Sequence, residues 1–132
     1  MTPDGLAISA SNYSPKETMA RLAAAVTDRG MTVLARIDHA AAAGKAGMEL
    51  RPTEVLIFGN PKAGTPLMQV AQTMGIDLPL KALVWQDDNG KTWLAYNDPK
   101  WLARRHHADA DADPILGAMT AVLAAAVEQA TA

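Results

Sequence analysis

The chain has 132 residues, of which 49% are hydrophobic and 20% charged, a balance typical of a globular domain rather than a disordered segment. Its formal net charge of −2 argues against nucleic-acid binding, because that binding needs a basic surface. The absence of cysteine excludes a disulfide framework, a thiolate metal site and a cysteine nucleophile. We therefore treat residues 1–132 as a single domain without a nucleic-acid partner.

The N-terminal part of the sequence predicts a strand, a helix and a second strand. Apolar and small residues alternate over 6–11, which indicates a half-buried strand. Ser14 and Pro15 then form a cap with proline at the first helical position, and Gly30 lies where a left-handed C′ residue ends a helix. Alternation resumes over 31–37 and predicts the second strand.

The middle of the chain predicts a buried strand that runs through a loop into a helix. Residues 40–48 are rich in alanine and glycine, which indicates a short helix or a loose connection. The continuous apolar run 55–58 is typical of a central strand. After the loop we expect Thr65 to cap a helix that Pro66 opens and that Gly75 ends in a Schellman motif.

The C-terminal part predicts a hairpin followed by two helices. Strands over 80–86 and 91–96 are joined by the turn sequence 87–90. Asp98 is expected to cap a short helix and Asp113 a long one. The resulting order β-α-β-β-α-β-β-α-α predicts an α+β fold with two layers, in which helices pack on one face of a mostly antiparallel five-stranded sheet.

No apolar stretch in the sequence approaches the roughly 20 residues that span a bilayer. The longest, 115–127, is too short and is diluted with alanine, and the N-terminus lacks the pattern of a signal peptide. We therefore expect a cytoplasmic protein without a membrane partner.

The loop 59–65 invites comparison with a phosphate-binding P-loop because it connects a strand to a helix. The lysine that such a loop needs is missing, and Pro61 and Pro66 each remove a backbone N–H, so nucleotide triphosphate hydrolysis is excluded. Two interpretations remain. One is an anion site that uses the N–H groups of Gly64 and the following turn with Lys62 as a point charge, and the other is a stiff turn.

Three histidines are the candidates for metal ligation or proton transfer. His39 follows Asp38 at the end of a strand, and His106 and His107 close a short helix. His39, one of the other two histidines and a carboxylate such as Asp98 or Asp38 would suit a divalent metal, although no spacing in the sequence demands one. The alternative is that the basic residues complement the negative end of the helix dipole.

Aromatic residues cluster in the hairpin and the helix after it. Trp85, Trp93 and Trp101 lie within a short span, and strand alternation places Trp93 and Tyr96 on opposite faces. Such residues line a pocket, fill a core or contact a partner subunit, and the last two uses are the more common.

Several of these segments together resemble the family catalogued as domain of unknown function 302. The matching stretches are 51–61, 64–68, 75–81, 96–99 and the pair Arg105-His106. The resemblance covers nearly the whole chain and implies a small α+β domain that forms a homodimer. It implies no reaction, because the family has no established activity.

The same resemblance ranks the polar positions, and it leads to the hypothesis of a dimeric binding or regulatory domain for a small polar or anionic ligand. Hydrogen-bond donors near the central loop would hold the ligand, and a histidine would tune its protonation. The candidate ligand-binding residues are Asn60, Lys62, Thr65, Asp77, Lys81, Tyr96, Asp98, His39 and His106.

Two alternatives belong to other functional classes. One is a metal-assisted or general acid–base hydrolase with His39 or His106 as base and Lys81 or Lys62 as electrophilic support. The other is a structural dimerisation module whose tryptophans and C-terminal helix form the subunit interface. The sequence specifies no cofactor and no catalytic residue.

Overall fold

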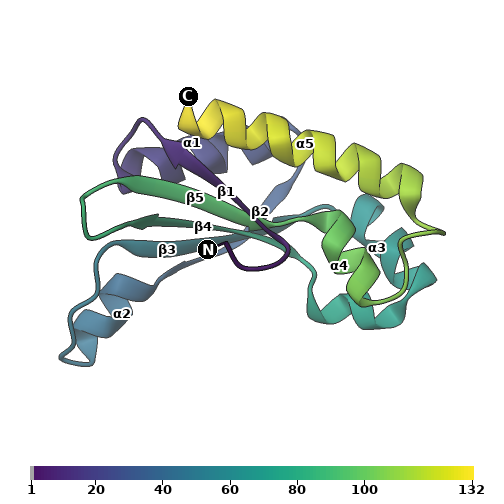
Figure 1. The fold of residues 1–132 in the computed structure, drawn as a ribbon, viewed down its shortest axis with the longest axis horizontal. Coiled ribbons are helices and arrows are strands. Elements are labelled where there is room, and N and C mark those ends of the chain that lie inside the picture. Colours follow the sequence, from purple (N-terminus) through teal and green to yellow (C-terminus); the bar gives the residue numbers. More distant parts are fainter. Residues whose placement is uncertain (1) are drawn as a thin grey trace.

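A five-stranded sheet is the centre of the computed structural model, which describes residues 2–132 (Figure 1). Its strands lie in the order β1-β5-β4-β3-β2, and all neighbouring strands are antiparallel. The bounds are β1 Leu6–Ser11, β2 Thr32–Asp38, β3 Thr53–Gly59, β4 Leu80–Gln86 and β5 Thr92–Asn97. The predicted five-stranded antiparallel sheet is confirmed.

The helices α1 and α5 lie together on one side of this sheet (Figure 1). Figure 1 shows α3, a short 3-10 helix η1 and α4 gathered at one end of the sheet, and α2 projecting from the other end. The bounds are α1 Pro15–Asp28, α2 His39–Lys45, α3 Pro61–Val70, η1 Gln72–Ile76, α4 Pro99–Arg105 and α5 Asp113–Thr131. The α+β class is confirmed, with α2 and η1 added to the predicted order.

The hydrophobic core fills the space between the sheet and the helices α1 and α5. Alternate residues of the central strands point into it because side chains on a strand alternate between faces. Each fully buried large apolar side chain contributes about 1.5–3 kcal/mol to folding. The buried members include Met19, Leu22, Val26, Leu56, Phe58, Val84, Leu94, Leu116 and Leu123.

Of the four predicted helix caps, Ser14 and Asp98 are confirmed and the other two are wrong. The Ser14 side chain accepts a hydrogen bond from Glu17 N (3.1 Å), and the Asp98 side chain accepts one from Lys100 N (3.0 Å). Asp113, however, is the first residue of α5, and Ala112 occupies the cap position without a side-chain bond. The Asp113 carboxylate therefore lies within the first turn, where it still favours the helix dipole.

The predicted start and end of the helix that follows β3, which is α3 in the structure, are also wrong. The Asn60 side chain caps α3 by accepting from Lys62 N (2.9 Å), so the helix begins at Pro61 and Pro66 lies inside it. Asn60-Pro61 carries the same cap-then-proline signal as Thr65-Pro66, and the earlier signal determines the start. After Val70 the backbone turns extended, and η1 replaces the expected continuation and Schellman end.

The C-terminal helix is long, as predicted, and it extends beyond the apolar stretch 115–127 on which the expectation of no membrane-spanning segment rested. With 19 residues, α5 is long and apolar enough to cross a membrane by length and composition alone. Its apolar stripe, which includes Met119 and Leu123, is buried in the core beside α1. A helix that packs against a sheet needs such an apolar stripe, so packing in the core accounts for the apolar composition of α5.

Candidate functional site

A cavity of about 830 Å³ opens at the end of the sheet where β3 runs into α3. It lies among α3, the N-terminal half of α5, the start of β2 and the segment that leads into β4. The volume falls in the range typical of small-molecule sites. Most of its walls are apolar, formed by Met31, Leu34, Met68, Leu78, Leu80, Ile115, Ala118, Met119 and Val122.

Local features of the sequence place these walls. Ile115, Met119 and Val122 are spaced four and three residues apart, so they lie on one face of α5. On β2 the pairing with β3 shifts between Val33 and Ala35, and the bulge residue Leu34 lines the cavity with 57% of its surface exposed. The cavity is therefore built by an edge-strand bulge and a helix stripe.

The polar groups of the cavity are few and carry only positive charge. Asn60, Lys62 and Thr65 come from the cap and first turns of α3, and Arg29 comes from the end of α1. No carboxylate is among the lining residues of the described chain. The Arg29 guanidinium is held in place, because Nη1 donates to Ala25 O (3.0 Å) and to Gln129 Oε1 (2.7 Å).

The backbone N–H groups that were expected to hold an anion are already used. Gly64 N and Ala63 N both donate to Asn60 O (2.9 Å each), and Lys62 N donates to the Asn60 side chain. Because α3 starts five residues earlier than expected, these donors belong to its first turns. The predicted backbone anion cradle is therefore wrong, and Lys62 stays as the cationic side chain of this loop.

A second polar cluster joins η1 to the end of α4. Asp77 Oδ2 lies 2.5 Å from His106 Nε2, and both Asp77 oxygens accept from Arg105 Nη1 (2.9 Å). On the other side of the ring, His106 Nδ1 lies 2.8 Å from Thr73 Oγ1. The His106 side chain is only 8% exposed. The network favours the tautomer in which Nε2 donates to Asp77 and Nδ1 accepts from the Thr73 hydroxyl.

Asp77 is held in its charged form. Burial alone would raise the pKa of its carboxyl, but the hydrogen bond from His106 and the charge and hydrogen bonds of Arg105 outweigh burial and lower the pKa below its usual value. The cluster therefore has the order of a carboxylate, an imidazole and a hydroxyl, which resembles an acid–base relay.

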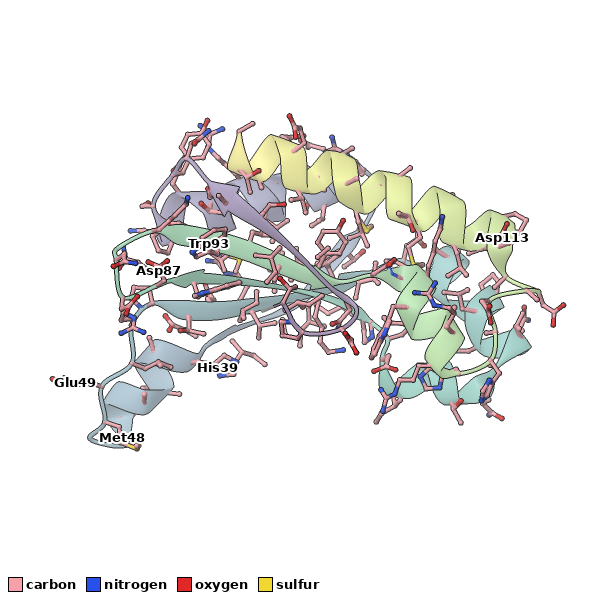
Figure 2. The ribbon with its side chains drawn as sticks, in the orientation of Figure 1. His39, Met48, Glu49, Asp87, Trp93 and Asp113 are labelled. Carbon is pink, nitrogen blue, oxygen red and sulfur yellow. The ribbon has the colours of Figure 1, made fainter. Side chains whose placement is uncertain are left out.

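The remaining candidate residues have other positions and partners. Lys81 Nζ donates to Pro79 O (3.0 Å) and reaches Asp77 O (3.5 Å) at the start of β4. Tyr96 is half-buried against the core, and burial together with the nearby Asp98 carboxylate raises the pKa of its phenol. His39 lies exposed on α2, far from α4 (Figure 2).

The nine predicted residues thus fall into separate groups. Three line the cavity, Asp77 and His106 pair beside Lys81, Tyr96 lies near Asp98 at the start of α4, and His39 stands apart on α2. Within residues 2–132, no three histidine, aspartate or glutamate side chains are close enough to share a metal ion. The metal set that would combine His39 with His106 or His107 is therefore not assembled.

Sequence reasoning missed two partners and most of the cavity. Arg105 was interpreted as a helix-end charge and as part of the family pattern, and Thr73 carried no signal. Their contacts with residues 28 and 33 positions away depend on the tertiary fold. The apolar walls were recognised as core positions. Nothing in their spacing showed that they surround an open volume.

Comparison with family models matches residues 8–126 to the model described as "Domain of unknown function DUF302". Among solved structures, the chain is similar to the "uncharacterized conserved protein DUF302 from Bacillus stearothermophilus". The TM-score is 0.86 and the identity 21%, over 97% of this chain and 99% of that one. At this identity the likeness shows the fold.

The chain is also 50% identical over 115 residues to two Brucella proteins named fluoride-specific ion channel FluC 1, from Brucella suis and Brucella abortus. The match covers 87% of this chain but only 45% and 43% of those proteins. The chain therefore spans less than half the length of these relatives.

Proposed function

This chain belongs to the DUF302 family, whose function is not known, and from its own geometry we propose that it binds a small molecule with an apolar body and an anionic group. The observation that carries this proposal is the cavity of about 830 Å³ beside α3. Its apolar walls favour a hydrocarbon or ring system, since burial of apolar surface provides most of the binding free energy.

The charged residues at the cavity indicate which polar group the ligand carries. Lys62 and Arg29 contribute positive charge, and no carboxylate within the described lining opposes it. Asn60 and Thr65 add hydrogen-bonding groups from the same helix start. A carboxylate or phosphate attached to an apolar body complements this arrangement, whereas a small, fully polar ligand leaves the apolar walls without a partner.

Titration calorimetry of the full chain with dodecanoate tests the proposal. We expect one site per chain with a Kd on the order of 10 μM, as typical ligand efficiencies indicate. Dodecanol, which lacks the anionic group, binds more weakly. Lys62→Gln reduces dodecanoate affinity about two- to fivefold, because a solvent-exposed ion pair contributes up to about 1 kcal/mol.

A matched pair of variants locates the site. Ala118→Trp places an indole in the cavity from the surface of α5, and we expect it to abolish binding. Ala124→Trp carries the same change at an exposed position of α5 outside the cavity lining and keeps wild-type affinity. No measurable binding to the wild type, or equal binding by both variants, contradicts the proposal.

The relatives support an extension of this proposal to a regulatory role. The matched domain makes up less than half of proteins named fluoride-specific ion channels, so we extend the proposal to a domain whose ligand modulates a membrane protein from the reducing cytoplasm. Replacing the matched segment of the Brucella suis protein by this chain tests it. Fluoride efflux from vesicles is expected to respond to dodecanoate, and the Ala118→Trp chimera to lose that response. A fluoride efflux rate that does not change with dodecanoate in either chimera contradicts the regulatory role.

The relay of Asp77, His106 and Thr73 supports the alternative of a hydrolase. Both nitrogens of His106 are already engaged, however, and none of the three residues lines the cavity. We therefore expect the wild type to hydrolyse p-nitrophenyl acetate no faster than His106→Ala. Turnover that His106→Ala removes and Thr73→Ser retains would favour the enzyme instead.

A further inference from the structure

The strand β2 forms one edge of the sheet, and its outer side is open. Within residues 2–132, β2 pairs only with β3, so the backbone N–H and C=O groups of its outer side have no strand beside them. Five of its seven residues are exposed, so this edge is accessible from solution. An open edge of this kind can accept one more strand from another molecule.

The two charged residues of β2 do not protect this edge. Edge strands commonly avoid pairing with other chains by carrying proline, lysine or free charges. Arg36 instead donates to Glu54 of the neighbouring strand, from Nε (3.3 Å) and from Nη2 (3.0 Å). Asp38 Oδ1 accepts from Ala41 N (2.9 Å), where it caps α2. Both charges are therefore engaged within the chain, and β2 contains neither proline nor lysine.

The apolar cavity lies at the beginning of this edge. The bulge residue Leu34 lines it, together with Arg29 just before β2 and Lys62 in the first turn of α3. A bulge interrupts regular pairing and redirects the chain. A strand that pairs with residues 35–38 therefore leaves the edge at the bulge, and its next residue meets the cavity.

The direction of β2 determines which end of an added strand meets the positive charges. From the cavity, β2 runs toward α2 at the other end of the sheet (Figure 1). An antiparallel strand beside it runs the opposite way, so its C-terminus reaches the cavity, whereas a parallel strand would bring an N-terminal amine there. Arg29 and Lys62 attract a carboxylate and repel an amine.

We propose that the anionic ligand is the C-terminus of a peptide or protein, whose last residues pair antiparallel with β2. This inference rests on the proposed function, because the last side chain is the apolar body that fills the cavity and the terminal carboxylate is the anionic group. Arg29 is suited to hold that carboxylate. Its guanidinium is already fixed by Ala25 O and Gln129 Oε1, so little side-chain freedom is lost on binding.

The other edge of the sheet lacks these features. Within residues 2–132, β1 pairs only with β5, but its start lies beside Asp98, whose backbone N–H donates to Gly5 O (2.8 Å). A C-terminus that arrived there would meet a carboxylate, and no residue of β1 lines the cavity. The strand β1 is therefore the internal control for β2.

Titration calorimetry of the full chain with a synthetic peptide tests the proposal. The probe is an N-acetylated peptide of alternating threonine and serine, about six residues long to match β2, that ends in leucine with a free carboxylate. We expect a Kd below about 1 mM and at least about tenfold weaker binding of the C-terminal amide. Ala118→Trp abolishes binding of the acid, and Ala124→Trp retains it. Equal binding of the acid and the amide overturns the proposal.

N-methylation of the peptide separates backbone pairing from attraction of charge alone. Alternate N–H groups of a strand point to the same neighbour, so methylation of one alternate set removes the hydrogen bonds to β2 and methylation of the other set does not. We expect the first methylated peptide to bind about tenfold more weakly and the second to bind within about twofold of the parent. Equal affinities of the two methylated peptides overturn pairing with β2.

Backbone amide NMR assigns the peptide to one edge. We expect the acid to shift the amide signals of residues 32–38 and to leave those of residues 6–11 in place. Shifts confined to residues 6–11, or absent from both edges, overturn the proposal. Dodecanoate has no backbone to pair with β2. Binding of dodecanoate without the peptide therefore overturns this inference alone, whereas the failure of both ligands to bind overturns the proposed function as well.

Discussion

Asp77 shows how one carboxylate joins segments that are distant in sequence. It accepts from both Arg105 and His106 at the end of α4, and its side chain is only 15% exposed. Hydrogen bonds to a charged group contribute about 1.5–3 kcal/mol each when their loss leaves a partner unpaired. We expect Asp77→Asn to lower the free energy of unfolding by about 2 kcal/mol at pH 7, measured by urea denaturation.

The exposed Asp88 in the hairpin turn is the matched control for that substitution. Asp88→Asn makes the same chemical change without an ion pair and is expected to alter stability by less than about 0.5 kcal/mol. Equal effects of the two substitutions would show that Asp77 does not stabilise the contact between η1 and α4.

The lowered pKa of Asp77 predicts a specific acid dependence. Because its pKa in the folded state lies below the unfolded value of about 3.9, the unfolded state binds the proton more readily. The contribution of Asp77 to stability is therefore fully present above about pH 5 and is lost as the pH falls through the folded pKa. Urea denaturation between pH 6 and pH 3 should show a difference between wild type and Asp77→Asn that shrinks toward pH 3. A constant difference contradicts this.

At the scale of elements, the turn before β1 depends on one glycine. Gly5 has a positive φ of 75°, and a Cβ there would lie 2.2 Å from Trp101 Cδ2. Gly30 has a similar φ of 80° but open space around it. Both substitutions by alanine carry the cost of a left-handed residue, about 1–2 kcal/mol.

Gly5→Ala adds a steric clash, so we expect it to destabilise the chain by about 1–3 kcal/mol more than Gly30→Ala. Thermal denaturation monitored by tryptophan fluorescence compares the two variants directly. Similar losses would mean that Trp101 moves aside freely and does not fix α4 against β1.

Local signals in the sequence explain which elements were predicted. Ser14-Pro15 and Asp98-Pro99 place a capping side chain and a restricted φ at adjacent positions, and the turn 87–90 joins two alternating strands, so local chemistry alone determines these elements. Asn60-Pro61 and Thr65-Pro66 present the same signal twice. Local chemistry could not decide between them, and the N-terminal pair determines where α3 begins.

At the scale of the whole molecule, the sequence identified individual candidate site residues better than it predicted which of them the fold brings together. Asn60, Lys62 and Thr65 are neighbours along the chain, and the structure places all three at one cavity. His39 and His106 are 67 positions apart, and only the fold shows that α2 and α4 lie at opposite ends of the sheet. The apolar walls could not be distinguished from core, since burial and cavity lining require the same residue types.

The methionines allow the central claim, an apolar cavity that binds an amphipathic anion, to be tested in one spectrum. Met31, Met68 and Met119 line the cavity, whereas Met19, Met48 and Met74 do not. In a methyl NMR titration of the full chain labelled with ¹³C-methyl methionine, we expect dodecanoate to shift the first three signals together and to leave the other three in place. Shifts confined to Met48, or no shift at saturating dodecanoate, would contradict binding in the cavity.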